Sequence, residues 1–159
     1  MTGRVLVIGV GNPFRRDDGA GPAVVEALRA RGERSAVLAV SDGDPGRLME
    51  LWSPADTVVV AEALRSPAGC PGRLHTVRAG RAASLAAATA STHGLGLAET
   101  MALAAALDRL PNELIVHAVE GVDFTAGVGL TSPVRAALPG LVRLVTASMR
   151  TVCPPHGRQ

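Results

Sequence analysis

Lysine and tyrosine are absent from this chain of 159 residues, and aromatic side chains make up only 2% of it. All 16 basic residues are therefore arginines. Without lysine the chain has no Schiff-base nucleophile and no phosphate-loop lysine, and without tyrosine it has no phenolic acid. Two Phe and one Trp are too few for a surface that stacks bases on aromatic rings, so we expect no nucleic-acid partner.

Cysteines and long apolar runs are also scarce. The two cysteines, Cys70 and Cys153, are far apart and belong to no Cys-x-x-Cys pair, so neither a disulfide framework nor a cysteine zinc site is supported. The apolar run at residues 5–10 is too short for a signal-peptide core. None of the longer segments is apolar enough to span a membrane. We therefore expect a cytoplasmic protein with no membrane partner.

Apolar runs that suit buried strands alternate with segments of helical periodicity along the chain, of which 47% is hydrophobic. We expect strands at residues 4–10, 36–40, 56–62, 73–78 and 113–119, and helices at residues 22–31, 47–52, 94–107 and 133–152. This alternation predicts one α/β domain over residues 1–152, a three-layer sandwich with a mostly parallel sheet of about five strands flanked by helices. Residues 153–159 are expected to form a flexible tail.

Polar residues at the ends of the expected strands locate a candidate site, because the ligand crevice of an open α/β sheet lies beyond the carboxyl ends of its strands. Asp17 and Asp18 follow the first strand, Asp42 follows the second, Glu62 ends the third, and His93 precedes the long helix. Two carboxylates and one imidazole form a suitable ligand set for a divalent transition metal and leave positions open for water or substrate.

Each of these residues also has a structural interpretation. Asp17 or Asp18 could cap the first helix, and Asp42 suits a turn in its Asp-Gly-Asp-Pro context. His93 could be a cap or a surface residue. Glu62 is harder to explain in this way, because an acid after four apolar residues is expected to be buried, and a buried carboxylate needs a partner.

Other catalytic and binding motifs are missing or incomplete. His75 and His117 fall inside expected strands and are interpreted as packing or surface residues. There is no Gly-x-Ser-x-Gly sequence, and neither cysteine adjoins a histidine base, so a Ser or Cys nucleophile has little support. Gly9-Val10-Gly11 starts like a dinucleotide fingerprint, but the third glycine position is Phe14 and acids follow, which excludes a phosphate cradle.

The polar segments resemble the hydrogenase maturation endopeptidases, which trim the C-terminal extension from the large subunit of nickel–iron hydrogenases. The matching segments are, in order, residues 9–21 (GVGNPFRRDDGAG), Asp42-Gly43, residues 58–63 (VVVAEA), residues 91–99 (STHGLGLAE) and residues 129–133 (GLTSP). Their order and spacing agree with the family over residues 4 to about 148.

The resemblance implies specific roles. In that family a metal is bound by the first-loop acid, the acid of the third strand and the histidine before the long helix, which here are Asp18, Glu62 and His93. Asp42 matches another motif position near that site and is our candidate catalytic residue. The resemblance also implies that nickel arrives in the large-subunit precursor rather than residing in the protease. Glu62 is one methylene longer than the Asp most often found there, which would shift the metal or the loop.

Two other functions are considered. In the first, the chain is a non-catalytic α/β protein that binds a hydrogenase subunit without cutting it. Peptidyl-tRNA hydrolases also begin with a strand and a Gly-x-Gly-Asn-Pro turn, but they need a histidine base early in the chain, and the first histidine here is His75.

Overall fold

The computed structural model describes residues 3–65, 69–81 and 97–152, which form a sheet with helices on both faces. The strands are β1 (Val5–Val10), β2 (Val37–Ser41), β3 (Thr57–Arg65), β4 (Leu74–Ala79) and β5 (Glu113–Gly121). The helices are the short 3-10 helix η1 (Arg16–Gly19), then α1 (Ala20–Ala30), α2 (Pro45–Trp52), α4 (Ala98–Ala106) and α5 (Ser132–Val152). The expected tail at residues 153–159 lies outside the described residues.

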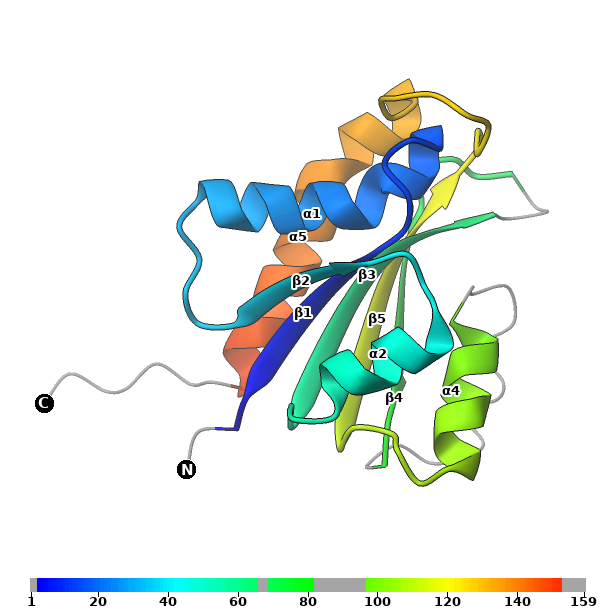
Figure 1. The fold of residues 1–159 in the computed structure, drawn as a ribbon. Coiled ribbons are helices and arrows are strands. Elements are labelled where there is room, and N and C mark those ends of the chain that lie inside the picture. Colours follow the sequence, from blue (N-terminus) through cyan, green and yellow to red (C-terminus); the bar gives the residue numbers. More distant parts are fainter. Residues whose placement is uncertain (1–2, 66–68, 82–96, 153–159) are drawn as a thin grey trace, which may run out of the picture.

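The five strands are arranged in the order β2-β1-β3-β5-β4. All neighbouring pairs are parallel except β4 with β5, which are antiparallel. Because the parallel strands point the same way, their carboxyl ends meet at one end of the molecule (Figure 1). The expected fold class, a three-layer α/β sandwich with a mostly parallel sheet of about five strands, is confirmed.

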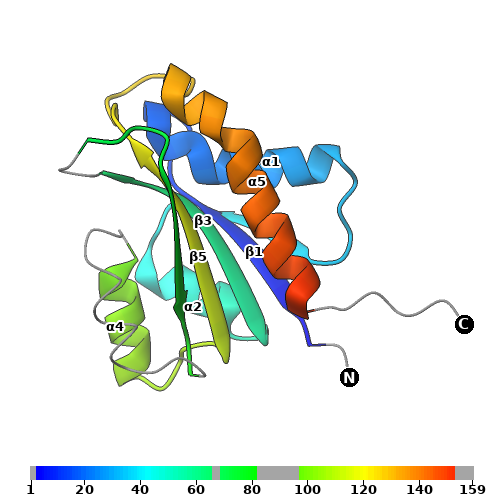
Figure 2. The same cartoon turned by 180° about the vertical axis from the view of Figure 1, so that it is seen from behind.

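Each face of the sheet is covered by a pair of helices. Helices α1 and α5 lie on one face, and α2 and α4 lie on the other (Figures 1 and 2). Side chains alternate between two apolar cores as the strand pleat requires: Val59 packs toward α1 and α5, whereas Val58 and Val60 pack toward α2 and α4. The central strands β1, β3 and β5 are buried along most of their length, which explains their nearly continuous apolar sequences, whereas the edge strand β2 is partly exposed.

The third strand is longer than expected. We expected Glu62 to end it, but β3 continues to Arg65 because every residue from Thr57 to Arg65 pairs with β5. Glu62 pairs with Ala118 and lies inside the sheet, next to the point where the β1 pairing ends at Gly9 and Ala61. Glu62 is therefore buried inside the sheet rather than positioned at the end of the strand.

Two glycines allow α1 to approach the sheet closely. A Cβ on Gly21 would lie 2.7 Å from the backbone nitrogen of Val10 and would clash with the carbonyl of Ala61. A Cβ on Gly9 would in turn clash with the carbonyl of Gly21. The first turn of α1 thus rests directly on the backbones of β1 and β3, which fixes the position of the preceding loop.

We expect Gly21→Ala to lower the free energy of unfolding by about 2 kcal/mol, since the added methyl forces two backbones apart. Gly46→Ala, in the first turn of α2, is the matched control, because the nearest atom to its Cβ is an Asp44 side-chain oxygen at 3.3 Å. Urea unfolding at neutral pH measures the free energy of unfolding of both variants. Equal stability of the two variants would contradict the proposed close packing.

No helix of the described part is long and apolar enough to cross a membrane.

Candidate active site

Asp17, the first of the two adjacent acids after β1, is a structural residue. Its carboxylate is buried and accepts hydrogen bonds from the backbone N–H groups of Val122 (2.8 Å), Asp123 (3.1 Å) and Thr131 (2.8 Å), and from the Thr131 hydroxyl (2.9 Å). Burial raises the pKa of Asp17, but these hydrogen bonds outweigh it and the pKa is lowered overall. Asp17 therefore stays ionised and ties η1 to the loop between β5 and α5.

Asp18, the second acid, lies in η1, which follows the carboxyl end of β1, and is only half-buried. Its Oδ2 accepts a hydrogen bond from the backbone N–H of Asn12 at 2.8 Å. Gly11 has a φ of +139°, and a Cβ there would clash with the Asp18 carbonyl, so glycine is needed for this loop to close. Neither acid caps α1, because the residue at its N-cap is Gly19, without a side-chain hydrogen bond.

Glu62 is the most unusual acid of the site. Only 4% of it is exposed, and its Oε1 has no hydrogen-bond partner among the described residues. Burial, and secondly the charge of nearby Asp18, raises the pKa of Glu62 to about 8. A buried carboxylate beside another carboxylate is costly in its charged form, so it takes up a proton or a cation. This orphaned oxygen fits the metal-ligand role expected for Glu62.

Asp42 directly follows β2, as expected, and is exposed. Its Oδ1 accepts a hydrogen bond from the Asp44 N–H at 3.1 Å, which confirms the turn interpretation. Asp42 also lines a surface hollow of about 670 Å³ together with Asn12, from the loop that carries Asp18, and Arg47 of α2. The catalytic role of Asp42 stays a prediction.

The structure thus places Asp18 and Glu62 together and Asp42 in the neighbouring hollow. His93 falls outside the described residues, and within residues 3–65, 69–81 and 97–152 no three His, Cys, Asp or Glu side chains converge on a common metal position. The assignment of Asp18, Glu62 and His93 as a ligand trio therefore stays a prediction.

His117 is a packing residue, as the sequence suggested. Its Nδ1 lies 2.8 Å from the Thr76 hydroxyl, and its Nε2 lies 2.7 Å from the Ser148 hydroxyl. Burial, assisted by the charge of Arg78, lowers the pKa of His117 to about 4, so the ring is neutral at physiological pH. Both ring nitrogens are occupied, which leaves none for a ligand.

His75 forms a pair that the sequence did not predict. Its Nε2 lies 2.7 Å from Oε1 of the buried Glu120, whose Oε2 accepts the Cys70 N–H at 3.0 Å. The hydrogen bond from His75 is the main cause that lowers the pKa of Glu120. His75 pairs with Ala118 of β5, and Ala118 pairs with Glu62, so the histidine is in the same row of the sheet as Glu62. No local signal could reveal this pair, because it depends on the antiparallel β4–β5 register.

Comparison with known proteins gives a consistent result. The family described as hydrogenase maturation protease matches residues 22–148. The chain is 29% identical over 149 residues to the hydrogenase 2 maturation protease of Escherichia coli (strain K12), covering 92% of this chain and 91% of that protein. It is 30% identical over 154 residues to the hydrogenase expression/formation protein HupM of Azotobacter chroococcum mcd 1, covering 92% and 73%.

Solved structures agree with this comparison. The hydrogenase maturating endopeptidase HybD from E. coli superposes with a TM-score of 0.73 at 27% identity, covering 94% of each chain. The maturation protease HybD from Thermococcus kodakarensis gives a TM-score of 0.62 at 22% identity, covering 92% of this chain and 99% of that one, which supports the fold alone.

Proposed function

We infer that this chain, which belongs to the hydrogenase maturation protease family, removes the C-terminal extension from the large-subunit precursor of a nickel–iron hydrogenase after nickel insertion. It is an endopeptidase of hydrogenase maturation, and proteases of this family act on hydrogenase large-subunit precursors. Membership of the family removes the peptidyl-tRNA hydrolase alternative.

The single observation that carries the proposal is the unpartnered Oε1 of Glu62 beside Asp18. Two carboxylates in a largely buried setting attract a cation, because it neutralises both charges at once. Asp18 and Glu62, with His93 as the predicted third ligand, would hold nickel that the precursor carries. This mixed oxygen and nitrogen set is chemically suited to a first-row transition metal.

Each residue then has a defined task. Nickel bound in the precursor would supply Lewis-acid polarisation of the scissile carbonyl or of an attacking water. Asp18 and Glu62 would hold the cation, and this would position the scissile peptide at the carboxyl end of the sheet. Asp42, exposed in the adjoining hollow, would accept a proton from the water. Cleavage in this arrangement requires nickel, so the protease would act as a checkpoint on nickel loading.

The test uses the purified protein with nickel-loaded and nickel-free forms of the cognate large-subunit precursor, read by intact mass spectrometry. We expect loss of one defined C-terminal peptide from the loaded form alone. Cleavage of both forms would leave the protease activity and remove the nickel requirement. The His93→Ala variant is expected to bind the loaded precursor without cleaving it.

A binding measurement on the same samples separates the enzyme from a non-catalytic partner. If the wild-type chain bound the loaded precursor and never cleaved it, the chain would be a binding module, and the roles proposed for Asp18, Glu62 and Asp42 would be wrong.

A further inference from the structure

Three apolar side chains are exposed around the loop that carries Asp18. Phe14 is 68% exposed, Val40 is 44% exposed and Val128 is 72% exposed. Phe14 and Val40 line the hollow of about 670 Å³ that contains Asp42. Val40 and Val128 line a second hollow of about 450 Å³, and Pro13 belongs to both hollows. We name the surface formed by Phe14, Val40 and Val128 the apolar rim.

The exposure of the apolar rim is fixed by the backbone. The Gly127 N–H donates to the carbonyl of Phe14 at 2.8 Å, and the Arg16 N–H donates to the carbonyl of Gly127 at 3.0 Å. Arg16 adopts a φ of +48°, which a non-glycine residue holds only when its surroundings impose it. Its guanidinium also donates to the Val128 carbonyl at 3.3 Å. The loop before η1 and the loop after β5 are thus joined as one unit.

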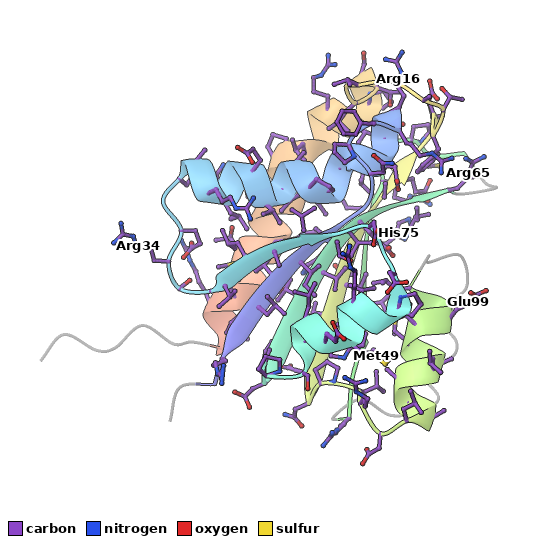
Figure 3. The ribbon with its side chains drawn as sticks, viewed as in Figure 1. Arg16, Arg34, Met49, Arg65, His75 and Glu99 are labelled. Atoms are coloured by element: carbon purple, nitrogen blue, oxygen red, sulfur yellow. The ribbon has the colours of Figure 1, made fainter. Side chains whose placement is uncertain are left out.

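The buried Asp17 carboxylate also stabilises this junction, because it accepts hydrogen bonds from the loop after β5. Figure 3 places Arg16 at the end of the molecule where that loop also lies. Phe14 and Val128 therefore cannot turn inward without breaking several hydrogen bonds. A rigid surface with exposed apolar side chains beside a cleft is typical of a binding interface, since little entropy is lost when it engages a partner.

The charges around the rim match the usual anatomy of a protein interface. Charged side chains of both signs surround the apolar side chains: Arg16 and Glu26 line one hollow, and the other is lined by Arg47, Glu50 and Asp42. An apolar centre with a polar, charged periphery is typical of protein–protein contacts. The surface adjoins Asp42 and the loop of Asp18, so whatever enters the active site lies against it. A second copy of the chain docked here would block that entry, which favours the substrate protein as the occupant.

We propose that Phe14, Val40 and Val128 form the docking surface for the folded body of the hydrogenase large-subunit precursor, which places the C-terminal segment of that precursor in the cleft. The proposal rests on the proposed function, because it identifies the surface through which that substrate is recognised. Contacts at the rim contribute to affinity, whereas the acids contribute to the chemical step.

The test compares Phe14→Ala and Val128→Ser with two α4 controls, Leu107→Ala at the C-cap of the helix and Leu103→Ser within it. The control side chains are also apolar and exposed, at 53% and 44%, but neither lines the two hollows. For each protein, the Kd for the nickel-loaded precursor is measured by biolayer interferometry, and KM and kcat are measured by mass spectrometry. Circular dichroism checks that every variant is folded.

We expect the rim variants to raise Kd and KM about tenfold with little change in kcat, as truncation of an interface anchor does. The α4 controls should match the wild type. Unchanged Kd and KM in both rim variants, or equal losses in the controls, would overturn the proposal. A wild-type chain that binds at the rim and does not cleave would refute the proposed function while leaving the docking surface intact. A wild type that neither binds nor cleaves would refute both.

Discussion

Glu62→Gln is expected to abolish processing of the precursor while making the protease more stable. The amide has nearly the same shape as the carboxylic acid but cannot carry the negative charge that a cation needs. We expect a loss of about a thousandfold in the processing rate, comparable to removing a principal electrostatic group from an active site. Intact mass spectrometry of the nickel-loaded precursor measures this loss.

The gain in stability depends on pH. The folded-state pKa of Glu62 is about 8, whereas its ordinary value is 4.5. The folded protein therefore holds this proton more tightly than the unfolded chain does. The stability that the folded protein gains from this tighter binding is complete below pH 4.5 and is lost as the pH rises through about 8. At pH 8.5 the metal-free Glu62→Gln variant should exceed the wild type by a few kcal/mol, and at pH 4.5 the two should nearly agree.

Urea unfolding of the metal-free proteins at these two pH values checks this expectation. Glu113→Gln, on the half-exposed first residue of β5, is the control and should leave both activity and the pH dependence unchanged. Glu62→Asp should keep measurable activity, since it retains a carboxylate. A Glu62→Gln variant that processes the precursor normally would refute the ligand role of Glu62.

Asp17→Ala is expected to be among the most destabilising single substitutions in the chain. It leaves the backbone N–H groups of Val122, Asp123 and Thr131 without their acceptor in a partly buried site. Unsatisfied donors of this kind cost about 1–3 kcal/mol each, so we expect a total loss of about 4 kcal/mol. Urea unfolding at pH 7 measures it.

The pH dependence of this effect has the opposite sign to that of Glu62. The pKa of Asp17 is lowered below its ordinary value of 3.8. The contribution of the Asp17 carboxylate to the free energy of unfolding is therefore present above that pH and is lost as the pH falls below it. The difference between wild type and Asp17→Ala should therefore shrink in acid. The neighbouring control is Asp18→Ala, which should cost little stability and most of the activity. Equal stability of the two variants would contradict the separate roles of Asp17 and Asp18.

Much of the fold followed from the sequence. The apolar runs that became β1 and β3 are buried on both faces, and such runs are recognisable because parallel strands of a covered sheet exclude polar residues. The alternation of strands and helices then leaves few possible topologies, since crossovers between parallel strands are right-handed and short. The expected places of Asp18 and Asp42 near the carboxyl end of the sheet follow from the same rule.

The separate roles of Asp17 and Asp18 were not predictable. The two residues are chemically identical neighbours, and both suited the same helix cap. They differ because the partners of Asp17 lie more than 100 residues away, between Val122 and Thr131. Only the packing of the loop after β5 against η1 brings those N–H groups to Asp17 and leaves Asp18 facing the site.

The sequence by itself determined that acidic side chains follow the apolar strands at the carboxyl end of the sheet, because strand direction and burial follow local hydrophobic patterns. The tertiary structure alone decided the environment of each group. It buried Glu62 inside β3 without a partner, paired His75 with Glu120 across the β4–β5 register, and held Phe14 and Val128 outward. These properties depend on contacts between distant segments, and desolvation and hydrogen bonding act through distance in space rather than along the chain.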